Sequence, residues 1–98
     1  MRREPGGFYL LDEPEAALSP SRQLVMLHKL VKLAGAGAQF VVSTHSPILL
    51  SAPGAEILAF DDSGIHAVRY EETETYRIYR AFTTNPDKIL KELFRDDA

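Results

Sequence analysis

Two short apolar runs separated by one amphipathic segment constrain the fold of this chain more than any other feature of its sequence. Phe8–Leu11 is continuously apolar and ends in acids, and Gln39–Thr44 is largely apolar and β-branched. Both patterns are typical of strands buried in a parallel sheet. The segment between the two runs is long enough for a right-handed crossover, so we expect the strands to be adjacent and parallel.

The connecting segment has the sequence marks of a helix over about residues 20–34. Ser19-Pro20 provides a cap and a first-turn proline, and Gly35-Ala36-Gly37 ends the helix. Ser46-Pro47 repeats this start signal for a short helix over Ile48–Leu50. The apolar residues of the long helix recur at three- and four-residue steps, on one face that we expect to cover the sheet. They are Leu24, Leu27, Leu30, Val31 and Ala34.

The second half of the chain has the pattern of a hairpin followed by two helices. Residues 56–60 and 65–70 flank an Asp-Asp-Ser-Gly turn, so we expect a hairpin that extends the edge of the sheet. A helix after Thr73 carries an aromatic stripe, and Asn85-Pro86 starts a last helix with an apolar stripe. We expect both stripes to face a core. Nearby glutamates oppose the alternative of a nucleic-acid surface.

The composition limits the classes of function. With 98 residues, 45% hydrophobic and 26% charged, the chain fits one domain or less of an ordinary globular protein that folds around a core. A net charge of -3 gives no general attraction to nucleic acid or membranes, and the lack of cysteine excludes thiol redox chemistry. No run of eighteen apolar residues occurs, so we expect a cytoplasmic protein without a membrane segment.

Polar residues that could bind a metal ion or take part in catalysis follow both predicted strands. Asp12 and His45 each come just beyond a strand, so parallel pairing should bring them side by side at one sheet edge. Asp12 can hold Mg²⁺ through oxygen ligation, and Glu13 can accept a proton from an attacking water or orient it. His45 can donate a hydrogen bond to a terminal phosphate oxygen. The two strand ends together therefore indicate phosphoryl-transfer chemistry.

Taken one at a time, these residues also have plainer interpretations. Asp12-Glu13 alone fits a solvated acidic turn, and His45 alone fits a capping or surface histidine. His28 and His66 lack a strand-end context, and we assign them structural or solvent-facing roles. Asp61-Asp62 could suggest a metal site, but acids before Ser-Gly are also what a hairpin turn prefers. We therefore assign this last pair to the turn.

At these positions the chain resembles ABC-type ATPases of the soluble AAA, chromosome-maintenance and DNA-repair group. Phe8–Pro14 is similar to their Walker B motif with its catalytic glutamate, and Ser43–Pro47 is similar to their switch-histidine loop. The resemblance covers roughly residues 6–60. It implies an α/β fold that is part of a P-loop NTPase domain, with a parallel strand-helix-strand core and a C-terminal hairpin and helices. Residues 1–98 would form a single partial domain.

The resemblance also implies roles for individual residues. Asp12 would bind the magnesium ion, Glu13 would be the hydrolytic base, and His45 would be a catalytic residue that senses the γ-phosphate. Ser19 would belong to the cofactor-binding, dimer-contacting loop, where many relatives have Asp instead. The implied cofactors are ATP and Mg²⁺, and nucleic acid is a partner only by family analogy.

Two motifs of this family are missing from the 98 residues. The sequence contains no Gly-Lys-Ser or Gly-Lys-Thr phosphate-binding loop and no Ser-Gly-Gly signature, both of which lie upstream of Walker B in the family. We therefore expect a fragment, a split-gene partner or a decayed reading frame that is inactive alone. Its partner would be the missing N-terminal ATPase half, a full-length homologue or a second copy of this chain. The alternative is a non-catalytic interaction or dimerisation module derived from the same fold.

Overall fold

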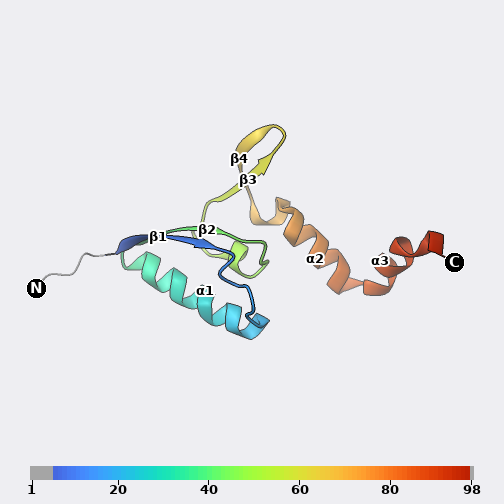
Figure 1. The fold of residues 1–98 in the computed structure, drawn as a ribbon, viewed down its shortest axis with the longest axis horizontal. Helices are drawn as coiled ribbons and strands as arrows, with labels where there is room; N and C mark the ends of the chain where they lie inside the picture. The colour runs from blue at the N-terminus through green and yellow to red at the C-terminus, as the bar shows by residue number, and fades with distance from the viewer. Residues whose placement is uncertain (1–5, 98) are drawn as a thin grey trace, which may run out of the picture. The chain divides into compact units, whose positions relative to one another are not determined.

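The computed structural model describes residues 6–97, and its packing divides the chain into two units, Met1–Ala55 and Glu56–Ala98 (Figure 1). Residues 1–5 and 98, the ends of the predicted domain, lie outside the described residues. The first unit contains β1 (Gly7–Asp12), α1 (Pro20–Gly35), β2 (Ala38–Ser43) and the 3₁₀ helix η1 (Leu49–Ser51). The second contains β3 (Ile57–Asp61), β4 (Gly64–Val68), η2 (Tyr70–Glu72), α2 (Glu74–Thr84), α3 (Pro86–Leu93) and η3 (Arg95–Asp97).

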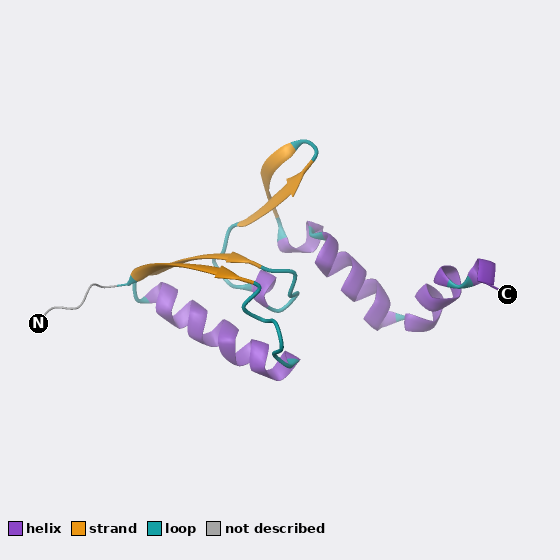
Figure 2. Ribbon diagram, in the orientation of Figure 1, coloured by secondary structure: helices purple, strands orange, loops and turns teal. Residues whose placement is uncertain are grey.

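The two strands of the first unit are parallel and adjacent, as predicted. Their register runs from Gly7 opposite Ala38 to Asp12 opposite Ser43. Figure 2 shows both arrows pointing to the same end of this sheet, with α1 lying along one face. The strand-helix-strand pattern of the sequence is therefore confirmed. A mixed α/β unit with a parallel two-stranded sheet is compatible with part of a P-loop NTPase fold.

Helix α1 begins and ends where its sequence signals indicate, but it buries a narrower face than expected. Ser19 caps it, and Pro20 is its first residue. At its other end, the N–H of Ala36 donates to carbonyl oxygens of the last turn. Three of the five residues predicted to cover the sheet, Leu27, Leu30 and Val31, are half-buried. The other two, Leu24 and Ala34, are exposed, which corrects the prediction. The physical reason is that a sheet of two strands is too narrow to cover the whole apolar stripe.

One face of the parallel sheet is open. Because side chains alternate along a strand, Phe8 and Leu10 share one face with Val41 of the neighbouring strand. These three are 61%, 71% and 56% exposed. On the opposite face, Tyr9 stacks on Phe40 with ring centroids 5.2 Å apart. The open face is thus an apolar surface that the described residues leave uncovered.

The described chain forms only a small core of its own. Its buried hydrophobic residues are Ala38 and Leu49, and no large side chain in residues 6–97 is fully buried. The expectation of a fold around a substantial core is therefore wrong for this part of the chain. The reason is geometric, because two-stranded sheets and single covering helices leave most apolar side chains with a neighbour on one side only.

The hairpin of the second unit was predicted correctly. Strands β3 and β4 are antiparallel, from Ile57 opposite Val68 to Asp61 opposite Gly64. Over the described residues they form a two-stranded sheet of their own, and the extension of the first sheet's edge by this hairpin stays a prediction. Gly64 closes the turn with φ +108, a conformation that favours glycine.

The helices of the second unit start where the sequence predicted them. Thr73 accepts a hydrogen bond from the N–H of Tyr76 at the start of α2, and Asn85 accepts one from Lys88 at the start of α3. The apolar stripes that were expected to face a core are largely exposed, which corrects that expectation. Tyr79, Phe82, Leu90, Leu93 and Phe94 are between 40% and 68% exposed. A 3.6-residue period identifies an apolar face but not the surface that covers it.

Candidate functional site

Residues 12–19, which run from the last residue of β1 to the cap of α1, have an unusual backbone and are called the acid loop below. Glu13 and Ala17 adopt positive φ values of 48° and 67° without being glycine. A non-glycine residue in this region costs on the order of 1–3 kcal/mol, and such residues cluster at functional sites. Hydrogen bonds within the loop hold it in place, from Ala16 N to Glu13 O (3.0 Å) and from Leu18 N to Glu15 O (2.8 Å). The chain therefore turns sharply directly beyond the strand.

The acid loop begins beside the segment after β2, residues 44–48, which is called the histidine segment. Asp12 pairs with Ser43 at the end of the parallel ladder, and the N–H of Glu13 donates to Ser43 O at 2.7 Å. His45 follows Ser43 by two residues. The two segments thus leave the sheet at the same edge, which confirms the predicted juxtaposition. The side chains of Asp12, Glu13 and His45 are exposed there.

Gln23 of α1 links the acid loop to the histidine segment. Its Nε2 donates to the carbonyl of Leu18 at 3.1 Å, and its Oε1 accepts a hydrogen bond from Ser46 Oγ at 2.6 Å. Gln23 was not assigned a role from the sequence, although a polar residue four positions before Leu27, in line with the apolar stripe of the helix, was a visible signal. Its two contacts fix both loops relative to the same helix.

Ser46 organises the histidine segment from a buried position. It is 4% exposed, and its Oγ accepts hydrogen bonds from the N–H groups of Ile48 and Leu49, both at 3.1 Å. Its own N–H donates to Thr44 Oγ1 at 2.9 Å. Ser46 thus holds the backbone ahead of a shorter helix than predicted, a single 3₁₀ turn over Leu49–Ser51 whose N-cap position is Ile48.

Glu15 makes the most direct side-chain contact between the two segments. Its Oε2 accepts a hydrogen bond from the backbone N–H of His45 at 3.4 Å. Its Oε1 is buried and has no hydrogen-bond partner in the described part of the chain. Sequence reasoning missed this residue because its partner lies thirty positions away.

Ser19, which the family resemblance assigns to cofactor binding, ends the acid loop as the cap of α1. Its Oγ accepts from the N–H of Arg22 at 3.3 Å and lies 3.2 Å from Ser21 Oγ. This cap accounts for the residue structurally. A contact between Ser19 and a nucleotide remains a prediction.

A self-contained metal centre is not formed by the described residues. No group of three or more His, Asp or Glu side chains in residues 6–97 is placed to hold a metal ion. Mg²⁺ in nucleotide sites, however, is usually held by one or two carboxylates together with phosphate oxygens and water. A single exposed carboxylate such as that of Asp12 fits this mode, and its role as a ligand remains a prediction.

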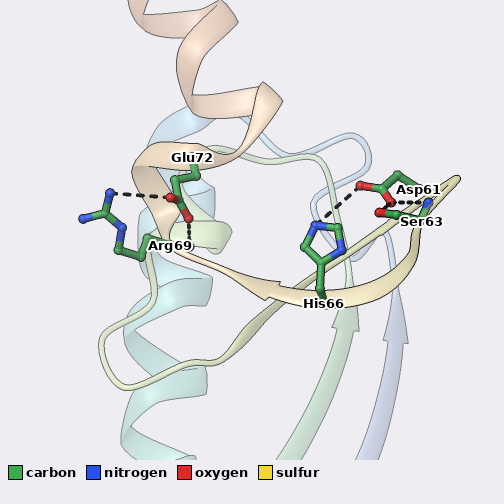
Figure 3. Close-up of polar contacts among 5 residues, drawn as sticks. All are labelled: Asp61, Ser63, His66, Arg69 and Glu72. Carbon is green, nitrogen blue, oxygen red and sulfur yellow. Dashed lines mark hydrogen bonds and ion pairs between the residues drawn. The ribbon is translucent and has the colours of Figure 1, made fainter.

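The acidic turn of the second unit is explained by local structure (Figure 3). The N–H and Oγ of Ser63 donate to Asp61 Oδ1 at 2.9 and 2.6 Å, and Asp61 Oδ2 lies 3.5 Å from His66 Nε2. The hydrogen bonds from Ser63 hold the pKa of the Asp61 carboxyl below its ordinary value of 3.8. These contacts confirm the hairpin turn at Asp61 and Ser63.

A second acid of this unit also has a local explanation. Figure 3 shows Glu72 beside Arg69, whose N–H donates to Glu72 Oε1 at 2.9 Å and whose guanidinium lies 3.5 Å from Oε2. The bond from the backbone N–H of Arg69 lowers the pKa of Glu72. Nearby, Tyr70 packs edge-to-face on Tyr76, and burial raises the pKa of the Tyr70 hydroxyl. These contacts stabilise the junction between hairpin and helix, and the candidate site stays with the first unit.

Comparison with known proteins gives one family match. The family model described as "AAA domain, putative AbiEii toxin, Type IV TA system" matches residues 1–51. The matched segment contains the acid loop, α1 and the histidine segment. No curated protein and no solved structure matches the chain. Over the described residues, no helix has the length and apolar character needed to cross a membrane.

Proposed function

Because the chain belongs to the AAA-domain family whose model matches residues 1–51, we propose that it supplies part of an ATP-hydrolysing site. In this proposal the site is of the ABC type, and its residues come from the acid loop and the histidine segment. Asp12 binds Mg²⁺, Glu13 is the general base, and His45 contacts the γ-phosphate.

The proposal rests on how the two parallel strands end beside each other. Asp12 lies opposite Ser43, and the N–H of Glu13 continues the ladder to Ser43 O at 2.7 Å. An acid pair and a histidine therefore emerge from neighbouring strands at one sheet edge, where α/β proteins bind their ligands. The positive φ of Glu13 supports the same location, since the backbone cost there is otherwise unexplained.

In the proposed chemistry, three exposed side chains have separate roles. The carboxylate of Asp12 provides a hard oxygen donor, the ligand type that Mg²⁺ prefers, and Mg²⁺ when bound neutralises charge on the phosphates. Glu13 accepts a proton from the attacking water or orients it, which typically contributes about 10²–10⁴-fold in rate. His45 donates a hydrogen bond to a phosphate oxygen and stabilises the charge that develops there.

The phosphate-binding loop must come from outside these 98 residues. No Gly-Lys-Ser or Gly-Lys-Thr occurs in the sequence, and a loop of this kind supplies most of the contacts to the phosphates. We therefore propose that the site is completed by an N-terminal ATPase half or by a full-length homologue. The isolated chain is expected to hydrolyse no ATP.

A second candidate function is a non-catalytic interaction module. The observation that favours it is the open apolar face of the parallel sheet, where Phe8, Leu10 and Val41 are all more than half exposed. Monomeric proteins rarely leave such a surface uncovered. On this hypothesis the fold remains as a binding surface, and the acid pair has no catalytic role.

The test is reconstitution with a phosphate-loop half encoded next to this chain. The co-expressed pair should hydrolyse ATP, and Glu13→Gln should keep ATP binding while lowering turnover by about 10²-fold or more, as expected for loss of a general base. Glu56→Gln is the matched control, because Glu56 is also an exposed glutamate but lies in the other unit.

The outcomes separate the two candidate functions. Unchanged hydrolysis in Glu13→Gln would remove this residue from the role of base. A tight complex with the phosphate-loop half that neither binds nor hydrolyses ATP would favour the interaction module instead.

A further inference from the structure

We propose that Glu15 is a positioning residue that ties His45 to the acid loop, an inference that rests on the proposed ATPase function. The contact is between Glu15 Oε2 and the backbone N–H of His45, at 3.4 Å. It leaves the imidazole of His45 free to meet a ligand, because the bond uses only the backbone. The distance is long for a hydrogen bond, but the acceptor is a carboxylate, which strengthens bonds of this kind.

The environment of Glu15 argues that it is more than a loop acid in solvent. The side chain is half-buried, and its Oε1 atom is buried with no partner in the described residues. Removing a carboxylate oxygen from water without a hydrogen bond is unfavourable, so the buried Oε1 atom of Glu15 destabilises the fold unless the side chain has a function that offsets this cost. The compensation we infer is the fixed relation of the acid pair to His45.

The location of Glu15 makes such a relation effective. It lies two residues after Glu13, and its carbonyl accepts the N–H of Leu18 at 2.8 Å, which braces the turn that carries the acids. A second link, from Ser46 through Gln23 to the same turn, holds the far side of the histidine segment. Glu15 is thus the side chain that joins the turn of the acid pair to the backbone of the histidine itself.

The contact is first tested on this 98-residue chain alone, by amide hydrogen exchange. In Glu15→Ala, the His45 amide should exchange about 3- to 10-fold faster, the change expected for loss of one hydrogen bond of ordinary strength, because the 3.4 Å length of this bond offsets the charge of its acceptor. The amides of β2 should keep their rates. Glu15→Gln retains an acceptor of the same reach and should stay close to the parent, whereas Glu15→Asp is one methylene shorter and should behave like the alanine variant.

Two results of this exchange experiment would overturn the proposal. One is an unchanged His45 amide in Glu15→Ala. The other is an equal acceleration along the whole of Ala38–Ser43, which would mean that Glu15 acts only on general stability. Glu56→Ala serves as the control for removal of a negative charge elsewhere.

The positioning role is then tested in the assembly with the phosphate-loop half. Glu15→Ala should lower kcat about 10- to 100-fold, the scale of a misplaced catalytic group, and change KM for ATP less than about 3-fold. Glu15→Gln should restore most of the turnover. In a His45→Ala background, Glu15→Ala should add almost nothing, because it acts through the histidine.

Kinetics and exchange together distinguish the failure of this inference from failure of the proposed function. If the losses from Glu15→Ala and His45→Ala multiply, Glu15 does not act through His45 and the positioning role is wrong. If the parent assembly hydrolyses no ATP, the proposed function fails, and the positioning role, which is defined for that reaction, fails with it even where the exchange data uphold the contact itself.

Discussion

Ser46→Ala tests whether the buried polar link between α1 and the histidine segment stabilises the first unit. The substitution removes the donor to Gln23 Oε1 at 2.6 Å and the acceptor for the N–H groups of Ile48 and Leu49. Ser46 is 4% exposed, so water cannot replace these bonds without local opening. Loss of the acceptor for the two N–H groups costs about 1 kcal/mol, and the unsatisfied partner on Gln23 costs about 1–2 kcal/mol more. We expect a total of about 2–3 kcal/mol.

Amide hydrogen exchange of β2 is the appropriate assay, because the chain packs as two units and a single global transition is not assured. A loss of 2–3 kcal/mol corresponds to about 30- to 150-fold faster exchange of amides that open with the first unit. The matched control is Ser51→Ala, because Ser51 Oγ also donates a hydrogen bond, to Ile48 O at 2.6 Å, but is exposed. Its loss should accelerate exchange only about 2-fold.

The amides of β3 and β4 belong to the other unit and should not change in either variant. If Ser46→Ala accelerated β2 exchange no more than Ser51→Ala does, the reasoning from burial and hydrogen bonding would be refuted.

Three further predictions concern packing, pH and helix propensity. Leu27→Ala should destabilise the first unit by about 1–2 kcal/mol, because Leu27 is half-buried, whereas exposed Leu24→Ala should cost less than about 0.5 kcal/mol in urea unfolding. The pKa of Asp61 is lowered by the folded hairpin, so its contribution to stability is present above pH 3.8 and is lost as the pH falls through the lowered value. In Ser63→Ala, a carbon-detected NMR titration should find the pKa of Asp61 returned toward 3.8, and an unmoved pKa would contradict the assigned cause. Gly35→Ala should raise the stability of the first unit by about 0.5–1 kcal/mol, since nothing lies within 4 Å of an added Cβ and alanine is the better helix former, and a loss in thermal unfolding would contradict this.

Sequence patterns predicted the elements of this chain well because those signals act over a few residues. The start signals at Ser19 and Asn85 lie where the structure has helix starts, and the helix predicted after Thr73 begins at Glu74. The parallel pairing of β1 and β2 followed from the length of the crossover between two apolar runs. The same argument placed the acid pair and His45 at one edge, and this placement agrees with the register that ends at Asp12 and Ser43.

Burial was predicted less well. The physical reason is that the spacing of apolar residues along a helix does not indicate which other segment packs against them. The stripes of α1, α2 and α3 were correctly placed along their helices, but much of their surface is exposed. An apolar face is a property of one segment, whereas its burial depends on what other segments lie against it.

What the sequence determined by itself is thus the strand-helix-strand order, the helix starts and the residue types that follow each strand. Only the tertiary structure decided which side chains connect the two loops. Glu15 meets the His45 backbone across 30 positions, and Gln23 meets Ser46 across 23. Such contacts depend on how the packed elements are placed. Local patterns of apolar spacing, capping or turn residues do not predict that placement.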